Sequence, residues 1–233
     1  MNLQPIRQDG FSGTRPGVST VQRNTVLRNT YWLLALSMVP TVLGAWLGVA
    51  TGLSRAMTPG ISLIVFLAGA FGFMYAIEKT KNSAAGVPML LGFTFFMGVM
   101  LSRLVGTVLG LGNGASLVMT AFAGTGAIFL GMASLSSVIK RDLSAMGKWL
   151  FIGMIMLLVA GIANFFIQSS ALMITLSVLA IGIFSAFILH DLKRVQDGLE
   201  TNYISATLGV YLSIYNVFQS LLMLLGIFGG RDE

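Results

Sequence analysis

The feature that most constrains this chain is a series of seven apolar stretches, each about as long as a membrane-spanning helix. About 20 consecutive apolar residues in an α-helix cross the hydrocarbon core of a bilayer. None of the stretches alternates with period two, as the strands of a membrane barrel would. The sequence therefore predicts an all-α membrane protein, a seven-transmembrane helix bundle. The predicted spans cover residues 30–50, 59–77, 85–107, 115–139, 146–167, 170–190 and 203–228.

Charge is too scarce for a soluble alternative. Only 9% of the 233 residues are charged and 55% are apolar, whereas about 25% of the residues of a soluble domain are charged. The net charge of +6 could suggest nucleic-acid binding, but the basic residues lie in particular connections between spans and form no single patch. We therefore expect the lipid bilayer as a partner, and no nucleic acid.

Basic residues are distributed unevenly among the connections. Four arginines precede residue 29, and seven more Lys or Arg residues lie in the connections after the second, fourth and sixth spans. These connections fall on one side of a seven-span arrangement, and cytoplasmic loops are enriched in Lys and Arg. We therefore predict a flexible basic cytoplasmic tail over residues 1–28, a bundle over residues 29–233, and a C-terminus outside. A re-entrant seventh segment is the competing topology, because this segment is the most polar.

The 28 glycines are expected to serve packing between helices. Lipid tails give one helix no hydrophobic reason to leave them for another, so helices in membranes associate through small residues that let backbones approach. Small residues four positions apart mark such contacts. The predicted pairs are Ala68 with Gly72, Gly106 with Gly110, and Ala127 with Gly131.

Few residues could support catalysis. The chain has no cysteine and a single histidine, His190, which excludes disulfides, thiolate sites and the usual zinc-binding sets. The string from Gly10 to Gly13 matches the surroundings of the serine in some intramembrane proteases, but it lies in the tail, and chance explains it better. We therefore expect a protein that is not an enzyme, with no catalytic residue, no cofactor and no metal site.

Ionisable residues at the edges of spans remain as functional candidates. Glu78 ends the second span beside two lysines, and His190 with Asp191 ends the sixth beside two basic residues. The simpler interpretation is an interfacial acid paired with neighbouring bases, which contributes little energy. The alternative is a proton-sensitive latch, in which partial burial disfavours the charged form of Asp191.

The seventh span carries a polar face. Polar groups in hydrocarbon need partners, so this face is expected to point into the bundle. It either supplies hydrogen bonds between helices or lines a hydrated path for an ion, and Asn164 and Gln168 of the fifth span are plausible partners. The residues that share the face by helical spacing are Ser205, Gly209, Ser213, Asn216 and Ser220.

Five motifs resemble a known family over roughly residues 24 to 231. Together with the seven spans, three of them are similar to the Bax inhibitor (transmembrane Bax inhibitor motif) family: Lys140-Arg-Asp-Leu-Ser144, Phe184-Ser-Ala-Phe-Ile-Leu-His-Asp-Leu192 and Tyr211-Leu-Ser-Ile-Tyr-Asn-Val-Phe218. Two more, Val26-Leu-Arg-Asn-Thr-Tyr-Trp32 and Glu200-Thr-Asn-Tyr-Ile204, resemble its Gram-negative inner-membrane branch. The resemblance implies a bundle of the Bax inhibitor type in the bacterial inner membrane, with its C-terminus in the periplasm.

Two functions follow from this resemblance. The preferred one is modulation of the membrane-anchored AAA+ metalloprotease FtsH in membrane-protein quality control, with the N-terminal tail as the segment that the protease engages. The alternative is a pH-sensitive calcium leak channel, in which two aspartates share a proton and latch the sixth helix to the seventh. Asp191 matches the first of these aspartates, but Ser213 stands at the second position. One carboxylate and one hydroxyl cannot show the like-charge coupling of two carboxylates.

The distance between these two side chains decides how far the latch can apply. A seventh helix that starts at Tyr203 places Ser213 about 15 Å from the cytoplasmic edge. We therefore expect Ser213 to lie away from Asp191, unless the seventh helix starts later or the sixth helix dips toward it.

Overall fold

The computed structural model describes the backbone of residues 20–229, and the side chains of these residues except 20, 54 and 55. Within this range it is built of helices without a strand, and seven of the helices are long and apolar enough to cross a membrane. The predicted fold class and all seven spans are confirmed. The helices are α1 (Thr20–Thr51), α2 (Leu53–Ala56), α3 (Pro59–Thr80), α4 (Gly86–Leu109), α5 (Gly114–Val138), α6 (Ser144–Ile167), α7 (Ser170–Gln196) and α8 (Tyr203–Gly229).

Two boundaries differ from the sequence prediction by more than three residues, and the two segments concerned contact each other. Helix α1 begins at Thr20, so residues 20–28 are helical where a tail was expected, and α7 continues six residues beyond its predicted end. The two extensions support each other: Val26 packs against Val195 and Ala206 in a small buried cluster. Arg23 also donates a hydrogen bond of 3.3 Å to the carbonyl oxygen of Gln196. The remaining part of the predicted tail, residues 1–19, lies outside the described residues.

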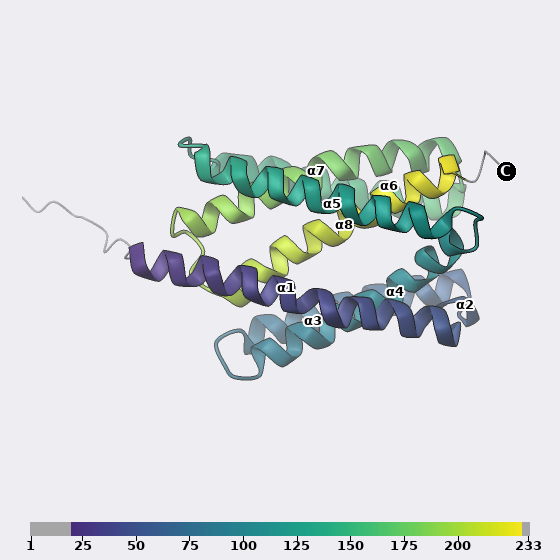
Figure 1. The fold of residues 1–233 in the computed structure, drawn as a ribbon, viewed down its shortest axis with the longest axis horizontal. Coiled ribbons are helices and arrows are strands. Elements are labelled where there is room, and N and C mark those ends of the chain that lie inside the picture. The colour runs from purple at the N-terminus through teal and green to yellow at the C-terminus, as the bar shows by residue number, and fades with distance from the viewer. Residues whose placement is uncertain (1–19, 230–233) are drawn as a thin grey trace, which may run out of the picture.

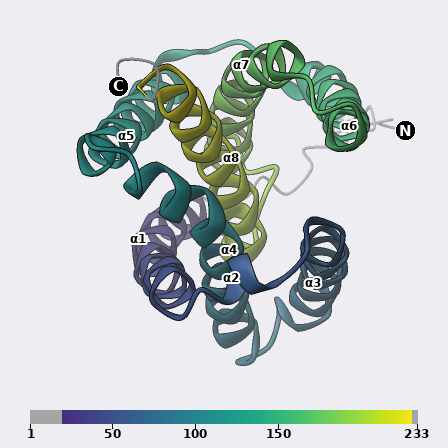
Figure 2. The ribbon, with the colours of Figure 1, turned by 90° about the vertical axis from the view of Figure 1, so that its right-hand side faces the viewer.

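Helix α8 forms the centre of the bundle. It contacts α1 and α4 on one side and α5 and α7 on the other, while α3 packs on α4 and α6 packs on α7 (Figure 2). Its buried side chains include Tyr211 and Tyr215, whereas α6 buries no residue. The core therefore lies along α4 and α8, and α6 is peripheral.

The seventh span crosses the whole bundle. Helix α8 is an unbroken helix of 27 residues, and it begins and finishes at opposite ends of the molecule (Figure 1). This geometry supports seven spans over a re-entrant seventh segment.

Glycines join α1 to α4 at positions that differ from the predicted ones. A Cβ added to Gly44 would lie 2.2 Å from the carbonyl oxygen of Phe95, and one added to Gly98 would lie 2.1 Å from that of Thr41. No residue with a side chain fits at such distances, so the two backbones touch directly.

The predicted glycine contacts at Gly72, Gly110 and Gly131 are wrong. Gly72 and Gly131 have no atom within 4 Å of an added Cβ, because they face away from the bundle. Gly110 ends α4, and its N–H group bonds the carbonyl groups of the last turn. Small-residue spacing occurs on lipid-facing and protein-facing sides alike, so spacing alone cannot choose between them.

Candidate functional site

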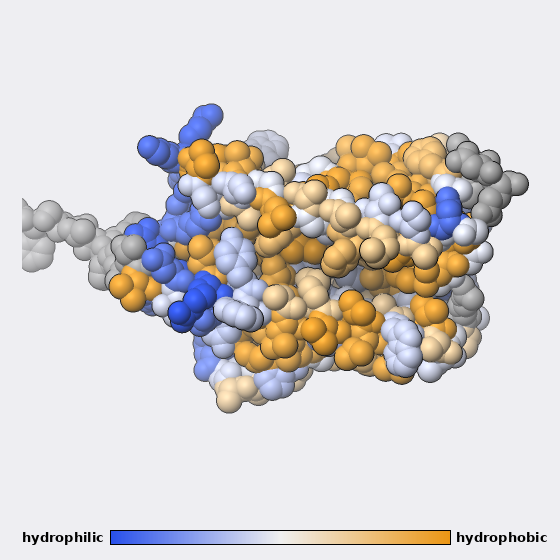
Figure 3. Space-filling model, viewed as in Figure 1, coloured by the Kyte–Doolittle hydropathy of each residue, from blue (hydrophilic) through white to orange (hydrophobic). Residues whose placement is uncertain are grey.

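Charged and polar residues gather at one end of the bundle, which we call the charged end. It consists of the start of α1 and the connections α3–α4, α5–α6 and α7–α8, which lie together in Figure 1. The hydrophilic surface gathers there in Figure 3, whereas the sides of the bundle are mainly apolar. An apolar belt with a charged end is the surface expected of a helix bundle in lipid.

His190 and Asp191 lie at this end and form a close pair. Nδ1 of His190 is 3.1 Å from Oδ1 of Asp191, and the two side chains are 8% and 18% exposed. Because α7 continues to Gln196, both residues lie inside the helix and not at its edge. The last turn tolerates Lys193 and Arg194 because cations near a helix C-terminus are favoured by the helix dipole.

Asp191 faces Gly209 of α8, one helical turn before Ser213. A Cβ added to Gly209 would lie 2.9 Å from Oδ2 of Asp191, so glycine at this position lets the carboxylate approach the α8 backbone. No hydrogen bond joins Asp191 to Ser213 within residues 20–229, since the Ser213 hydroxyl donates to the carbonyl oxygen of Gly209 at 3.1 Å. The structure thus brings Asp191 against α8, but it places Ser213 one helical turn further into the bundle.

Two side chains on the polar face of α8 are satisfied within their own helix. The amide nitrogen of Asn216 donates to the carbonyl oxygen of Leu212 at 2.8 Å, as Ser213 does to Gly209. Such bonds to the residue four positions earlier satisfy a polar side chain without a partner on another helix. Ser213 is 3% exposed and points inward as predicted.

Glu78 lies apart from this site. Its carboxylate pairs with Nζ of Lys81 at 2.5 Å, and its side chain is 65% exposed. This is the simpler of the two interpretations, an exposed acid paired with a neighbouring base.

The expected partners from the fifth span do not join the site. Asn164 and Gln168 lie at the turn between α6 and α7, where the side-chain oxygen of Asn164 accepts the N–H group of Ser169 at 3.0 Å. Gln168 ends α6 with a φ of 56°. This expectation was wrong because α6 is peripheral and packs on α7.

Asn202 is a residue whose role sequence analysis missed. Its side-chain oxygen accepts the N–H groups of Ile204 and Ser205 at 2.9 and 3.1 Å, which caps the start of α8. Its amide nitrogen donates to the carbonyl oxygen of Lys81 and to the side chain of Asn82, at 3.1 and 2.8 Å. One side chain therefore ties α8 to the α3–α4 connection. An asparagine directly before an apolar helix was the available signal.

Asp142 caps the peripheral helix α6 at the same end. Its Oδ1 accepts the N–H group of Ser144 at 2.8 Å. Hydrogen bonds from the side chain and the backbone of Ser144 lower the pKa of Asp142 below its ordinary value of 3.8. The carboxylate therefore stays ionised at neutral pH, and its negative charge near the N-terminus of α6 interacts favourably with the helix dipole.

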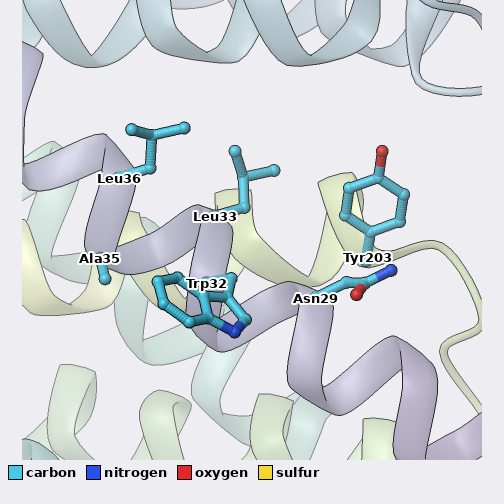
Figure 4. A pocket seen from close by; sticks show the side chains of 6 residues that line it. All are labelled: Asn29, Trp32, Leu33, Ala35, Leu36 and Tyr203. Atoms are coloured by element: carbon cyan, nitrogen blue, oxygen red, sulfur yellow. The ribbon is translucent and has the colours of Figure 1, made fainter.

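Two cavities open on the surface near the charged end. The larger, about 550 Å³, lies between α1 and the start of α8, where Leu33, Leu36 and Tyr203 point to the same side (Figure 4). Trp32 lies beside it and is 73% exposed, which suits an aromatic ring at a membrane interface. The smaller, about 360 Å³, lies between α6 and α7 and is bordered by His190 and Asp191. Over residues 20–229, no cluster of three His, Cys, Asp or Glu side chains could hold a metal ion.

Comparison with known proteins places this architecture in a family. Residues 23–230 match the family described as "Inhibitor of apoptosis-promoting Bax1". The "Modulator of FtsH protease YccA" of Escherichia coli K12 is 35% identical over 221 residues, which cover 95% of this chain and 98% of that protein. An "Uncharacterized membrane protein" of Vibrio cholerae is 36% identical over 222 residues, 95% of this chain and 98% of its own length.

The same Escherichia coli protein in a second strain is named "Inner membrane protein YccA" and aligns equally well. The family match covers residues 23–230, which is nearly all of the described bundle. The chain is therefore a seven-span membrane protein that belongs to the Bax inhibitor family.

Proposed function

We propose that this protein modulates a membrane-anchored AAA+ protease of the FtsH type and is not itself an enzyme. It would act in the bacterial inner membrane, with the charged end and the N-terminus in the cytoplasm and the C-terminus in the periplasm. The observation that carries the proposal is the similarity to the modulator of FtsH over 95% of this chain. The basic residues of the charged end favour the same orientation, because cytoplasmic connections are rich in Lys and Arg.

The charged end has the properties expected of a bundle that a processive protease can hold but not easily extract. Side chains cross-link its connections: the Gln196 amide donates to the hydroxyl of Ser136 at 2.8 Å. Arg23 donates to Gln196, and Asn202 joins α8 to the α3–α4 connection. A pulling force applied before Thr20 would first meet the Arg23–Gln196 bond, which holds the start of α1 to α7. The other two bonds hold the remaining helices of this end together.

Deletion of residues 2–19 tests this proposal, because it leaves α1 and the Arg23 contact in place. We expect the truncated protein to lose most of its co-purification with FtsH and to be degraded more slowly by it. A matched control replaces residues 2–19 by a shuffled sequence of the same composition, which keeps length and charge. Unchanged association and unchanged turnover of the truncated protein would contradict the proposal.

A pH-sensitive cation leak is the second candidate function. One observation favours it: the His190–Asp191 pair borders a cavity and touches the backbone of α8, so a change of charge there would act on the α7–α8 contact. Because Asp191 meets Gly209 and not a second carboxylate, any proton response would involve the His190–Asp191 pair and not a shared proton.

Calcium flux into vesicles tests the channel directly. The protein is reconstituted with a calcium dye and compared at acidic and neutral pH with Asp191→Asn and with Glu78→Gln, an exposed acid far from the pair. We expect Asp191→Asn to alter the pH dependence and Glu78→Gln to leave it unchanged. Absence of flux above the lipid background removes this candidate.

A further inference from the structure

The cavity between α6 and α7 differs from the rest of the surface in its chemistry. It measures about 360 Å³ and is bordered by the first two turns of α6 and the last three turns of α7. Its polar residues include Ser144, Lys148, His190 and Arg194. Phe151 and Phe187 also line it.

The lining changes from polar to apolar along the helix axis. Ser144 and Arg194 are nearest to the charged end, whereas Phe151 lies seven residues further along α6, about 10 Å deeper. A cavity that is cationic at the interface and aromatic toward the hydrocarbon matches the profile of a phospholipid, whose phosphate lies above its acyl chains.

The charges in the cavity favour an anion. Lys148 has no ion-pair partner within residues 20–229, and Arg194 is bound only weakly, at 3.9 Å from Glu200 with a side chain 43% exposed. The only carboxylate in the lining, that of Asp191, is already occupied by Nδ1 of His190. Two cations thus face the cavity with little internal compensation.

His190 supplies a second, independent indication. Its side chain is only 8% exposed, and within the described residues its Nε2 has no hydrogen-bond partner. This nitrogen lies against Gly147, where an added Cβ would come within 2.6 Å of it. The side chain as a whole is buried, but it borders the cavity, and Nε2 is not among the fully enclosed polar atoms of the described residues. A ring nitrogen in this position is available to bind a ligand in the cavity.

We propose that this cavity is a binding site for a phosphate group, with Lys148 and Arg194 as its charged contacts and Phe151 and Phe187 as an apolar floor. The floor favours the phosphate of an anionic phospholipid headgroup over a free phosphate ester. The site does not depend on the protease role, because it requires only the α6–α7 geometry.

Native mass spectrometry of the purified protein tests the site. The protein is titrated with phosphatidylglycerol, with phosphatidylcholine and with water-soluble glycerol phosphate. We expect tighter binding of phosphatidylglycerol than of phosphatidylcholine, and a loss of roughly fivefold in phosphatidylglycerol affinity for Lys148→Gln and for Arg194→Gln. Lys148→Arg should restore most of the affinity.

Lys140→Gln is the matched control, because it removes the same charge from the same end of the protein but outside the cavity lining. Equal losses for Lys140→Gln and Lys148→Gln would show a diffuse electrostatic effect and overturn the site. Binding of glycerol phosphate as tightly as phosphatidylglycerol would support the phosphate site and assign it to a soluble ester. Equal affinity for both lipids, without binding of glycerol phosphate, would overturn the proposal. Thermal unfolding of each variant separates loss of binding from loss of fold.

Discussion

Two helix contacts of this bundle both rely on glycine, but they differ in what the glycine meets. At the α1–α4 contact, Gly98 faces the backbone oxygen of Thr41, and an added Cβ would lie 2.1 Å from it. At the α6–α7 contact, Gly147 faces the ring of His190, which borders an open cavity. The α1–α4 contact has no room for adjustment, whereas the α6–α7 contact has a movable side chain and free volume.

This difference separates two regions of the molecule. We call α1, α4 and α8 the structural half, and the α6–α7 contact with its cavity the adaptable corner. Helix α4 buries ten residues and α6 buries none. Backbone contact fixes α1 against α4 and supports the central helix α8. The α6–α7 corner contributes less to stability, and it contains the charged pair and the cavity that could respond to a ligand.

The largest expected effect comes from Gly98→Ala. Overpacking of a rigid contact costs about 3 kcal/mol, because neither backbone can move without breaking its helix. We expect this loss in the free energy of unfolding, measured by denaturant titration in detergent micelles. Gly131→Ala is the matched control, since an added Cβ there would meet no atom of another residue within 4 Å outside the adjoining backbone of its own helix. Alanine at this position should stabilise the helix by about 0.5 kcal/mol or more. Similar losses of stability for Gly98→Ala and Gly131→Ala would show that the backbone contact at Gly98 does not cause the loss.

Asn202→Ala is expected to cost about 1–2 kcal/mol of unfolding free energy, because it removes the cap of α8 together with the bond to the α3–α4 connection. Asn113→Ala provides the comparison: Asn113 precedes α5 but makes no capping hydrogen bond with its side chain. We expect a change within about 0.5 kcal/mol for Asn113→Ala. Hydrogen exchange at the first turn of α8 should rise only in Asn202→Ala. Equal stability of the two variants would show that the Asn202 side chain does not stabilise the start of α8.

Gly147→Ala should cost less than about 1 kcal/mol, because the imidazole of His190 can rotate into the adjacent cavity. The added Cβ would lie 2.6 Å from Nε2 of His190, compared with 2.1 Å from the Thr41 oxygen at Gly98. Both distances are too short for a real contact, so this variant tests whether a side-chain neighbour lowers the cost relative to a backbone neighbour. The measurement is the same denaturant titration. A loss as large as that of Gly98→Ala would show that the α6–α7 corner is as rigid as the α1–α4 contact.

The smallest expected effect is a pH dependence at Asp142. Its folded pKa is lowered below 3.8, so the stabilisation by its ionised form is complete above that value and is lost as the pH falls through the lower folded pKa. Asp142→Asn keeps a capping oxygen but cannot ionise. The stability difference between the wild-type protein and Asp142→Asn should therefore shrink on acidification below pH 3.8. A difference that grows in that range would have the wrong sign.

Much of the fold could be predicted from the sequence, because apolar length alone defines a span in lipid. The seven spans and the gathering of basic residues at one end follow directly from composition along the chain. The helical extensions of α1 and α7 could not be predicted, since they depend on the contact of Val26 with Val195 and on Arg23 reaching Gln196. The residues of the candidate site could be predicted from the sequence, but their geometry could not. Asp191 was identified as a candidate, whereas Gly209 was predicted only as one residue of the polar face of the seventh span.

The sequence by itself determined that this chain crosses a membrane seven times and where its charges gather, because the bilayer imposes the same length and charge rules on every helix. Only the tertiary structure decided which glycines touch another helix, that Asp191 faces Gly209 and not Ser213, and that α6 leaves a cationic cavity beside α7. These features depend on the rotation and depth of one helix against another. A residue pattern within a single helix leaves both undefined, since lipid and protein neighbours accept the same apolar and small side chains.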